Sequence, residues 1–477
     1  MTMRLLRAWI AAVLLSLLGY LAFVRLGVAY PPLKLFGVLT QLLGVPRLFQ
    51  LVHTLFGLGQ GGKIFAFSGV ALLWLGGLTV FGALGRPVFG GLLTALVCLL
   101  LVPWQTALLY GLAFTALLES VATLLAGRAS RLHPERSQPD QGRRGATAAL
   151  AAGGALVAGG GLFSLFRSTG APPSAVTVPV PGGPLPFGVT PVGQWYYVSK
   201  NLEAFDPKLD GAKWQLKVGG MVRSPQSFSL TDLKGFQPVT EELTLSCISN
   251  PVGGPLISNG IWQGFRLSEL LKKVGVQPGA RYLLWEAADG YTESLPLGRA
   301  LEDDVLLVHS LNGRPLTPKH GFPLRVLIPG RYGMKQPRWI TGIRLSDRDQ
   351  PGYWVKRDWS RTALVELTSR IDVPVETSPV VKAGQPGFLR GIAFFGDKPI
   401  TKVEVSTDGE KSWQTARLIP PRSRSVWTPW ELAWTPQAGN HQLSVRAYSG
   451  STVQKSEEKD ALPEGATGYH HFIVNAG

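Results

Sequence analysis

Residues 243–256 read Leu-Thr-Leu-Ser-Cys-Ile-Ser-Asn-Pro-Val-Gly-Gly-Pro-Leu, and they contain Cys247, one of only two cysteines in the 477-residue chain. Residues 242–246 form a strand-like run, and Asn250-Pro251 with Gly253-Gly254 predicts a sharp turn directly after the thiol. Two interpretations of the thiol follow. A cysteine at a strand end before a polar turn can point into a cleft, whereas most cysteines without a disulfide are packed in a core.

Composition divides the chain into two parts. Residues up to about 166 are overwhelmingly apolar, whereas the remainder mixes charged residues, tryptophans and turn residues as soluble proteins do. A chain of this length is expected to form two or three domains. Its two cysteines exclude a disulfide framework and any Cys-rich zinc or iron–sulfur site. The formal net charge is +16, but the basic residues are dispersed and no basic helix is predicted, so nucleic acid is excluded as a partner.

Residues 1–167 are predicted to be a transmembrane helical region of about five spans. The predicted spans are 5–28, 64–84, 88–102, 106–126 and a mildly hydrophobic Ala/Gly segment at 146–166. The segment 33–58 carries charges and a proline, so we interpret it as an interfacial or re-entrant piece. The first span could instead be a cleaved signal peptide, but no small-residue cleavage site precedes Tyr30.

Charged residues predict the orientation of these spans. Arg4 and Arg7 indicate a cytoplasmic N-terminus, and the basic loop 128–144, which follows four spans, should also be cytoplasmic. A fifth span then places the chain after Arg167 outside the cytoplasm, as a multi-pass protein of the cell membrane. Arg143-Arg144 resembles a twin-arginine export signal, although the pair would also suit an ordinary cytoplasmic flank.

A second dense motif covers residues 319–339. A predicted buried strand, 324–328, is surrounded by basic residues, and glycines at 330 and 333 would let the backbone approach a ligand closely. The surrounding basic residues are His320, Arg325, Arg331, Lys335 and Arg338. Basic groups converging on a glycine-rich turn suit a phosphate or another anion, and a solvated basic loop is the alternative. Elsewhere, Ser229 and Ser268 are predicted to cap short helices.

The two motifs together resemble the sulfite oxidase family of molybdopterin enzymes. The Cys247 loop precedes Trp262-Gln-Gly and a Leu-Leu helix, and 319–339 has the family's pattern of His-Gly-x-Pro-x-Arg, strand, Pro-Gly and a basic turn. The resemblance covers 194–477 and implies an α+β molybdopterin-binding catalytic domain at 194–366. It also implies an immunoglobulin-like dimerisation domain at 367–477, where short alternating strands predict a β-sandwich. Residues 168–193 are then a Pro/Gly-rich linker.

The resemblance assigns roles to individual residues. Cys247 would be the thiolate ligand of molybdenum, which requires the deprotonated form. Ser199, with Lys200 beside it, stands where sulfite oxidases place an arginine, and Trp359 stands where they place a tyrosine, so we predict these three with Cys247 as catalytic residues. The predicted cofactor-binding residues are Tyr197, Val198, Ser199, Lys200, Asn201, Cys247, Asp289, His320, Arg325, Lys335, Gln336, Pro337 and Arg338.

The resemblance also implies a molybdenum–molybdopterin cofactor, transfer of an oxygen atom to or from a small S- or N-containing substrate, and electron exchange with an external carrier such as a cytochrome. A homodimer through the C-terminal domain would follow from the same likeness. Lysine does not reproduce a bidentate arginine clamp, so the candidate substrates are a sulfoxide, an N-oxide or another small oxyanion beside sulfite. The alternative from another class is a non-catalytic membrane-anchored binding protein on a degenerate molybdopterin fold.

Overall fold

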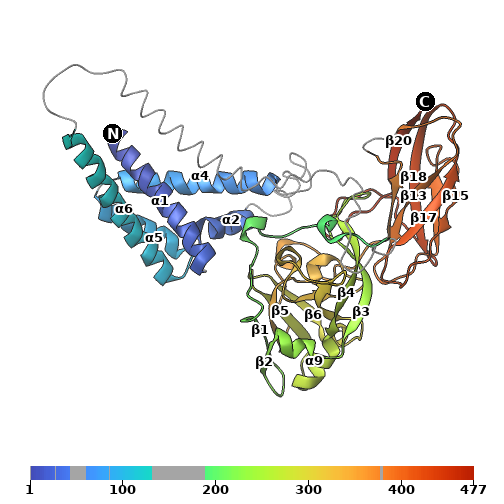
Figure 1. The fold of residues 1–477 in the computed structure, drawn as a ribbon, viewed down its shortest axis with the longest axis horizontal. Coiled ribbons are helices and arrows are strands. Elements are labelled where there is room, and N and C mark those ends of the chain that lie inside the picture. The colour runs from blue at the N-terminus through green and yellow to red at the C-terminus, as the bar shows by residue number, and fades with distance from the viewer. Residues whose placement is uncertain (1, 27, 43–60, 85, 132–187, 377–379) are drawn as a thin grey trace. The chain divides into compact units, whose positions relative to one another are not determined.

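The computed structural model describes residues 2–26, 28–42, 61–84, 86–131, 188–376 and 380–477. The chain divides into two compact units, Met1–Leu39 with Phe65–Val178, and Thr40–Ile64 with Pro179–Gly477. The described part of the first unit is helical, and the second unit contains the β-sheets (Figure 1). The predicted span 146–166, the pair Arg143-Arg144 and most of the predicted linker lie outside the described residues.

The helices of the N-terminal region are α1 (Thr2–Leu26), α2 (Pro31–Leu42), α4 (Gly61–Ala83), α5 (Pro87–Leu99) and α6 (Trp104–Arg131). Three stretches, Met3–Phe23, Phe65–Ala83 and Trp104–Leu125, are long and apolar enough to cross a membrane. Helix α5 has 13 residues and therefore rises only about 20 Å, against about 30 Å for a hydrocarbon core. The predicted full span at 88–102 is therefore wrong, because the helix ends at Leu99. Of the predicted interfacial piece, only the start lies in a described helix, α2.

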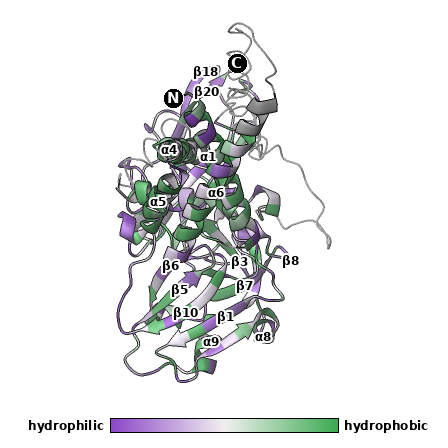
Figure 2. Ribbon diagram, turned by 90° about the vertical axis from the view of Figure 1, so that its left-hand side faces the viewer, coloured by the Kyte–Doolittle hydropathy of each residue, from purple (hydrophilic) through white to green (hydrophobic). Residues whose placement is uncertain are grey.

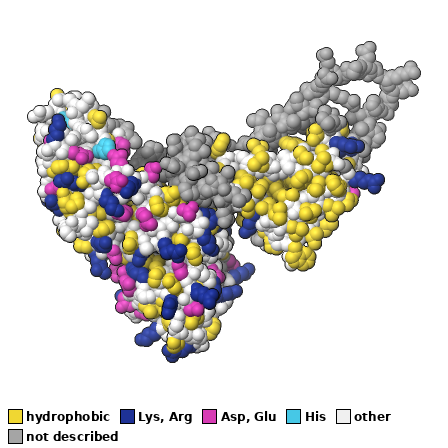
Figure 3. Space-filling model, turned by 180° about the vertical axis from the view of Figure 1, so that it is seen from behind, with side chains coloured by type: hydrophobic (Ala, Val, Ile, Leu, Met, Phe, Trp, Pro, Cys, Tyr) yellow, Lys and Arg dark blue, Asp and Glu magenta, His cyan; other side chains and the backbone are white. Residues whose placement is uncertain are grey.

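Small residues let α5 and α6 pack closely. A Cβ built on Gly91 would lie 1.9 Å from the Oγ1 of Thr115, and one on Gly111 would lie 2.7 Å from the Cβ of Ala95. Such contacts are typical of helices that associate in lipid. Most of the ribbon of these helices is coloured as hydrophobic in Figure 2. Large apolar side chains face outward from this unit, and the space-filling view shows them gathered on its surface (Figure 3). More than half exposed are Leu17, Leu72, Leu96, Leu109, Leu112 and Leu124, among others.

Two sheets with short helices build the first part of the second unit, an α+β arrangement. One has the order β2-β1-β10-β5-β6 and the other β3-β4-β7-β8, with β9 paired to β7. Their bounds are β1 Gln215–Gly220, β2 Gln226–Ser229, β3 Val239–Ser246, β4 Ile257–Arg266, β5 Tyr282–Ala287, β6 Thr292–Pro296, β7 Leu306–Leu311, β8 Arg314–Pro315, β9 Arg325–Leu327 and β10 Ile340–Ser346. The helices are α8 (Leu230–Lys234), α9 (Leu267–Val274) and α10 (Leu297–Ala300). A core that includes Trp285, Leu307 and Val326 draws side chains from both sheets.

Two further sheets follow after residue 367. Their strands are β11 Thr368–Val373, β12 Val380–Val381, β13 Gly387–Phe394, β14 Lys402–Ser406, β15 Gln414–Thr415, β16 Arg417–Leu418, β17 Thr428–Trp434, β18 Gly439–Ser449, β19 Thr452–Val453 and β20 His470–Ala476. The orders are β11-β13-β17-β16 and β12-β20-β18-β14-β15, with β19 paired to β18. Leu389, Trp430, Val405 and Val445 share one core across both sheets, so the two sheets form a sandwich. The predicted likeness of this sandwich to an immunoglobulin domain stays a prediction.

Short local signals had mixed outcomes. Ser229 caps α8 through a capping box with Asp232, as predicted. The predicted cap at Ser268 is wrong, because Arg266 is the N-cap of α9 and the Ser268 hydroxyl donates to Asp303 instead. At the end of the predicted linker, Thr190 is bonded to Asn259 of β4 through its backbone N–H (2.8 Å), so the last linker residues contact the sheet.

Candidate active site

The hairpin between β3 and β4 presents Cys247. The Cys247 N–H donates to the Leu256 carbonyl (2.9 Å), and the Asn250 side chain accepts from the Leu256 N–H (2.8 Å), which closes the loop 247–256 at its base. The half-buried Cys247 Sγ lies 3.0 Å from the Ser249 hydroxyl. The hairpin therefore holds a partly accessible thiol in a defined loop.

Two tyrosines that the sequence analysis did not single out, Tyr196 and Tyr332, lie close enough to this thiol to be influenced by its charge. Burial raises the pKa of Tyr196 and Tyr332, and a negative charge on Cys247 would raise both pKa values further. A Cβ on Gly333 would lie 2.9 Å from the Tyr196 hydroxyl. The close approach predicted at Gly333 is therefore to a protein side chain, and the one predicted at Gly330 is to Asp397 (2.8 Å). Phenols next to a cysteine carry no linear motif, so only the fold reveals them.

His320, Arg325 and Arg338 form what we call the arginine cluster. Arg325 is 6% exposed, and its Nη1 donates to the His320 carbonyl (3.3 Å). Its Nε–H is buried and has no hydrogen-bond partner among the described residues. Burial, followed by the nearby Arg338 guanidinium, lowers the pKa of Arg325 to about 9. Two guanidinium groups thus share a sheltered site with little negative charge beside them.

The other members of the arginine cluster are held by backbone carbonyls. Arg338 donates to Lys319 (2.8 Å) and to Val198 (3.0 Å), which ties the turn before β10 to the segment 197–201. Burial, and then the charge of Arg325, lowers the pKa of His320 to about 4. His320 is therefore neutral at neutral pH, and the positive charge of the cluster is carried by the arginines.

The segment 197–201 forms the Asp206 network, which consists of Tyr197, Ser199, Asn201 and Asp206. Asp206 accepts hydrogen bonds from the Tyr197 hydroxyl, the Ser199 hydroxyl (3.1 Å) and the Asn201 side-chain amide (3.1 Å). Sequence reasoning missed Asp206, because a carboxylate five residues after Asn201 matches no motif. The network anchors three of the predicted cofactor-binding residues.

Asp289 joins this network to Lys200. The Asp289 side chain is 6% exposed, accepts from the Asn201 amide (3.2 Å) and lies 3.4 Å from the Lys200 ammonium. Lys200 also donates to the Asp289 carbonyl (2.8 Å). The structure thus brings together five of the predicted residues, Tyr197, Ser199, Lys200, Asn201 and Asp289.

Other predicted residues shape the turn around the arginine cluster. Lys335 forms a buried ion pair with Glu293 (2.7 Å), whose pKa is raised by burial. The Gln336 side chain bonds the backbone of Ile328 and Arg331, and the Pro337 carbonyl accepts from Val326 (3.1 Å). These contacts fix the turn itself.

Trp359 lies in an apolar cluster that borders the Cys247 loop through Ile248. It is 5% exposed and belongs to the same buried group as Ile248 and Tyr332, next to Trp354 with ring centroids 6.4 Å apart. Ser199 belongs to the Asp206 network. The predicted roles of Ser199 and Trp359 in substrate choice stay predictions.

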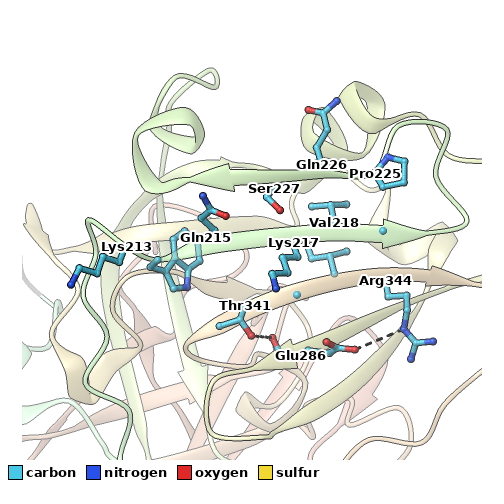
Figure 4. Close-up of a pocket in the computed structure, with 14 residues that line it drawn as sticks. Lys213, Gln215, Lys217, Val218, Pro225, Gln226, Ser227, Glu286, Thr341 and Arg344 are labelled. Carbon is cyan, nitrogen blue, oxygen red and sulfur yellow. Dashed lines mark hydrogen bonds and ion pairs between the residues drawn. The ribbon is translucent and has the colours of Figure 1, made fainter. Parts of the chain in front are cut away.

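A surface hollow of about 800 Å³ lies on the sheet formed by β1, β2, β5 and β10 (Figure 4). Lys217 and Gln215 lie along β1 in this hollow, and Glu286 pairs with Arg344 (3.8 Å). None of the predicted site residues lines it. The hollow is therefore distinct from the Cys247 region.

Comparisons with known proteins bear on the same residues. Residues 203–354 match the oxidoreductase molybdopterin binding domain. This range contains Cys247 and all of the arginine cluster, and it ends before Trp359. The uncharacterized oxidoreductase YuiH of Bacillus subtilis is 36% identical over 150 residues, which are 31% of this chain and 74% of YuiH. The chain belongs to the sulfite oxidase family of molybdopterin-dependent oxidoreductases.

Longer relatives of the family extend the match. Human mitochondrial sulfite oxidase is 30% identical over 285 residues, 50% of this chain and 52% of that protein. The barley nitrate reductase [NAD(P)H] is 28% identical over 347 residues, 60% of this chain and 39% of the reductase. The chain thus spans about half the length of the sulfite oxidases it matches. The sulfane dehydrogenase SoxCD from Paracoccus pantotrophus has a similar fold, with a TM-score of 0.53 and 24% identity over 61% of this chain and 84% of that chain.

The family's cofactor is molybdenum–molybdopterin, and the residues present fit it. A pterin phosphate is an anion, and the arginine cluster offers two guanidinium groups and the buried Nε–H of Arg325, which has no hydrogen-bond partner in the part of the chain that the structure describes. Charge-assisted hydrogen bonds from arginine to phosphate are strong and often bidentate. A thiolate is a soft ligand of the kind that Cys247 provides. The cluster and the thiol therefore suit the two ends of such a cofactor.

Proposed function

We propose that this chain is a membrane-anchored molybdenum enzyme that transfers an oxygen atom to or from a small S- or N-containing substrate. The observation that carries the proposal is the arginine cluster, in which Arg325 is buried at 6% exposure beside Arg338, and no carboxylate of the described residues is among the groups that shift its pKa. Burying an unpaired charge destabilises a fold by several kcal/mol. A bound anion removes that penalty, so the cluster is best explained as an anion site.

In this proposal each group has a defined task. Arg325, Arg338 and the neutral His320 bind the pterin phosphate, and Cys247 binds the metal as a thiolate. The cofactor supplies the oxygen-transfer chemistry and the storage of two electrons. The Asp206 network holds the backbone of 197–201, to which Arg338 donates, and thereby orients the cofactor relative to Cys247.

The substrate is proposed to be a neutral sulfoxide or N-oxide rather than sulfite. The Ser199 hydroxyl donates to Asp206, and the Lys200 ammonium lies 3.4 Å from the Asp289 carboxylate. Position 199 therefore offers no charge, and the charge of Lys200 is largely balanced. A charged oxyanion would lack the arginine clamp that a bidentate site requires.

A substrate screen tests this choice. The purified full chain is assayed with a redox dye against sulfite, several sulfoxides and several N-oxides, after its molybdenum content has been measured. We expect molybdenum in the protein and faster turnover of a neutral S- or N-oxide. Efficient oxidation of sulfite would overturn the substrate assignment. Absence of molybdenum from a chain made in a cofactor-producing host would overturn the proposal that the chain is a molybdenum enzyme.

Membrane anchoring rests on the three long apolar helices and their exposed leucines. We propose that the chain after residue 167 lies outside the cytoplasm, as a multi-pass protein of the cell membrane, and exchanges electrons with an external carrier such as a cytochrome. A homodimer through the C-terminal sandwich is part of the same proposal. A reporter enzyme that works only in the cytoplasm can be fused at Gly477. Activity of this reporter would contradict the proposed orientation.

A further inference from the structure

The C-terminal sandwich contacts the Cys247 loop through Arg370 of β11. The Arg370 Nη1 donates to the Gly254 carbonyl (2.8 Å), and its Nε donates to Asp372 (2.7 Å). The second bond fixes the direction of the guanidinium, so the first bond holds the far side of the loop. Arg370 and Gly254 are separated by 116 residues in the sequence.

His470 of β20 presses against the same loop at the neighbouring residue. Gly253 has φ +74°, and a Cβ built there would lie 2.1 Å from the His470 Cδ2. His470 is 6% exposed, and its Nδ1 accepts from the Ile371 N–H (3.0 Å), which fixes the plane of the ring. The imidazole therefore leaves Gly253 no room to move toward the sandwich.

The strand and the residues that flank the loop are held by the sandwich as well. The Thr244 N–H donates to the Ser425 carbonyl (3.0 Å), and the Thr244 hydroxyl accepts from the Trp427 N–H (2.9 Å). Ile248, next to the cysteine, shares a buried apolar cluster with Phe394 of β13 and with Trp427. The loop is thus held by the sandwich on its strand, beside its cysteine and across its turn.

We propose that Arg370 and His470 are positioning residues that fix the Cys247 thiol for the metal, so that the sandwich is part of the active-site scaffold. The proposal rests on the proposed function, in which Cys247 is the ligand. A ligand thiolate must keep one direction to bind a metal well, and residues that orient a ligand typically change metal affinity about tenfold to a hundredfold. Arg370 contacts the loop at Gly254 and His470 contacts it at Gly253, so each acts through the loop.

The experiment measures the rate at which iodoacetamide alkylates Cys247 in the full chain, made in a host without molybdopterin and carrying Cys98→Ser. We expect Arg370→Met to raise this rate about tenfold, because it keeps the length of the side chain and removes a charged hydrogen bond. Arg370→Lys keeps the charge and one donor but loses the two-point hold on Asp372 and Gly254, so its rate should lie between those of the parent and Arg370→Met. The matched control is Arg390→Met, which removes an exposed arginine of β13 paired with Glu431 (3.4 Å) and should leave the rate unchanged.

His470→Asn gives a second route if Arg370→Met fails to fold. The Asn side-chain oxygen can still accept from Ile371, while the part of the ring that touches Gly253 is removed, and the alkylation rate should again rise. In the cofactor-loaded chain, both variants should also change the electron paramagnetic resonance spectrum of the one-electron-reduced molybdenum, Mo(V). Parent-like alkylation in both variants would overturn the proposal. If the chain purified from a cofactor-producing host contains no molybdenum, that result would count against the proposed function alone. The comparison of alkylation rates would remain valid.

Discussion

The Asp206 network and the arginine cluster lie on either side of the contact between Arg338 and Val198, yet they differ in how their charges are compensated. Asp206 accepts three hydrogen bonds from its own segment, so the network is complete within the protein. Arg325 is buried beside a second guanidinium, and its Nε–H finds no partner among the described residues. A network whose hydrogen bonds are satisfied within the protein fixes geometry, whereas a buried cation without a counter-charge indicates an anionic ligand. Loss of the cofactor should therefore change the stability of the arginine cluster and leave the Asp206 network unaffected.

The largest effect is expected at Cys247, the proposed metal ligand. Cys247→Ser should lower turnover by more than about a hundredfold, because an oxygen ligand is a poor substitute for a soft thiolate. The fold should survive, since the closing bonds of the loop use backbone atoms and Asn250. Steady-state kinetics and circular dichroism check both points. The control is Cys98→Ser in the membrane unit, and near-normal turnover of the Cys247 variant would refute its role.

The next effect separates the two regions directly. Arg325→Met should lower the molybdenum content at least about tenfold, because it removes a guanidinium group that would donate hydrogen bonds to the pterin phosphate. The same variant should make the cofactor-free chain more stable, since replacing a buried, poorly paired charge with an apolar side chain is often stabilising by about 1–4 kcal/mol. Metal analysis and thermal unfolding of both forms check this pair of results. A less stable cofactor-free variant that still binds molybdenum would contradict the anion site.

Sequence patterns predicted the elements that depend on local chemistry. The strand at 324–328 is present as β9, and the capping box at Ser229 formed because its partner Asp232 lies three residues away. Arg325 was identified because its neighbours in sequence are also its neighbours in space. Helix α5 was predicted too long, because hydropathy continues to Val102 while the helix ends at Leu99.

Contacts between distant residues were not accessible to the same reasoning. Asp206 matters because the chain folds back on Tyr197 and Ser199, and no spacing rule for carboxylates marks it. Arg370 reaches Gly254 across 116 residues, and Lys335 pairs with Glu293 across 42 residues. Such pairings depend on how the sheets stack, and no regular spacing of residues in a single sequence indicates that stacking.

The pH dependence of unfolding tests the burial of His320 in the arginine cluster. The pKa of His320 falls from 6.5 to about 4 in the fold. Between these pH values His320 is protonated in the unfolded chain and neutral in the folded chain. The free energy of unfolding therefore decreases as pH falls from 6.5 to 4, by up to roughly 3 kcal/mol. His320→Asn should remove that part of the slope in the cofactor-free chain. Denaturant unfolding at several pH values checks it, and identical slopes in parent and variant would contradict the burial of a neutral imidazole.

The smallest effect is expected for Asp206→Asn, which tests whether the network is complete without the cofactor. The amide keeps the shape of the carboxylate but replaces one acceptor with a donor that faces hydroxyl or amide groups of Tyr197, Ser199 and Asn201. Loss of charge-assisted hydrogen bonds should destabilise the chain by about 1–3 kcal/mol. Because these bonds are internal, the loss should be equal in the cofactor-free and cofactor-loaded chains, and the molybdenum content should stay near that of the parent. Thermal unfolding of the two forms measures the difference. A loss confined to the loaded chain would mean that Asp206 acts on the cofactor directly, and the distinction between a self-sufficient network and a ligand-dependent cluster would then fail.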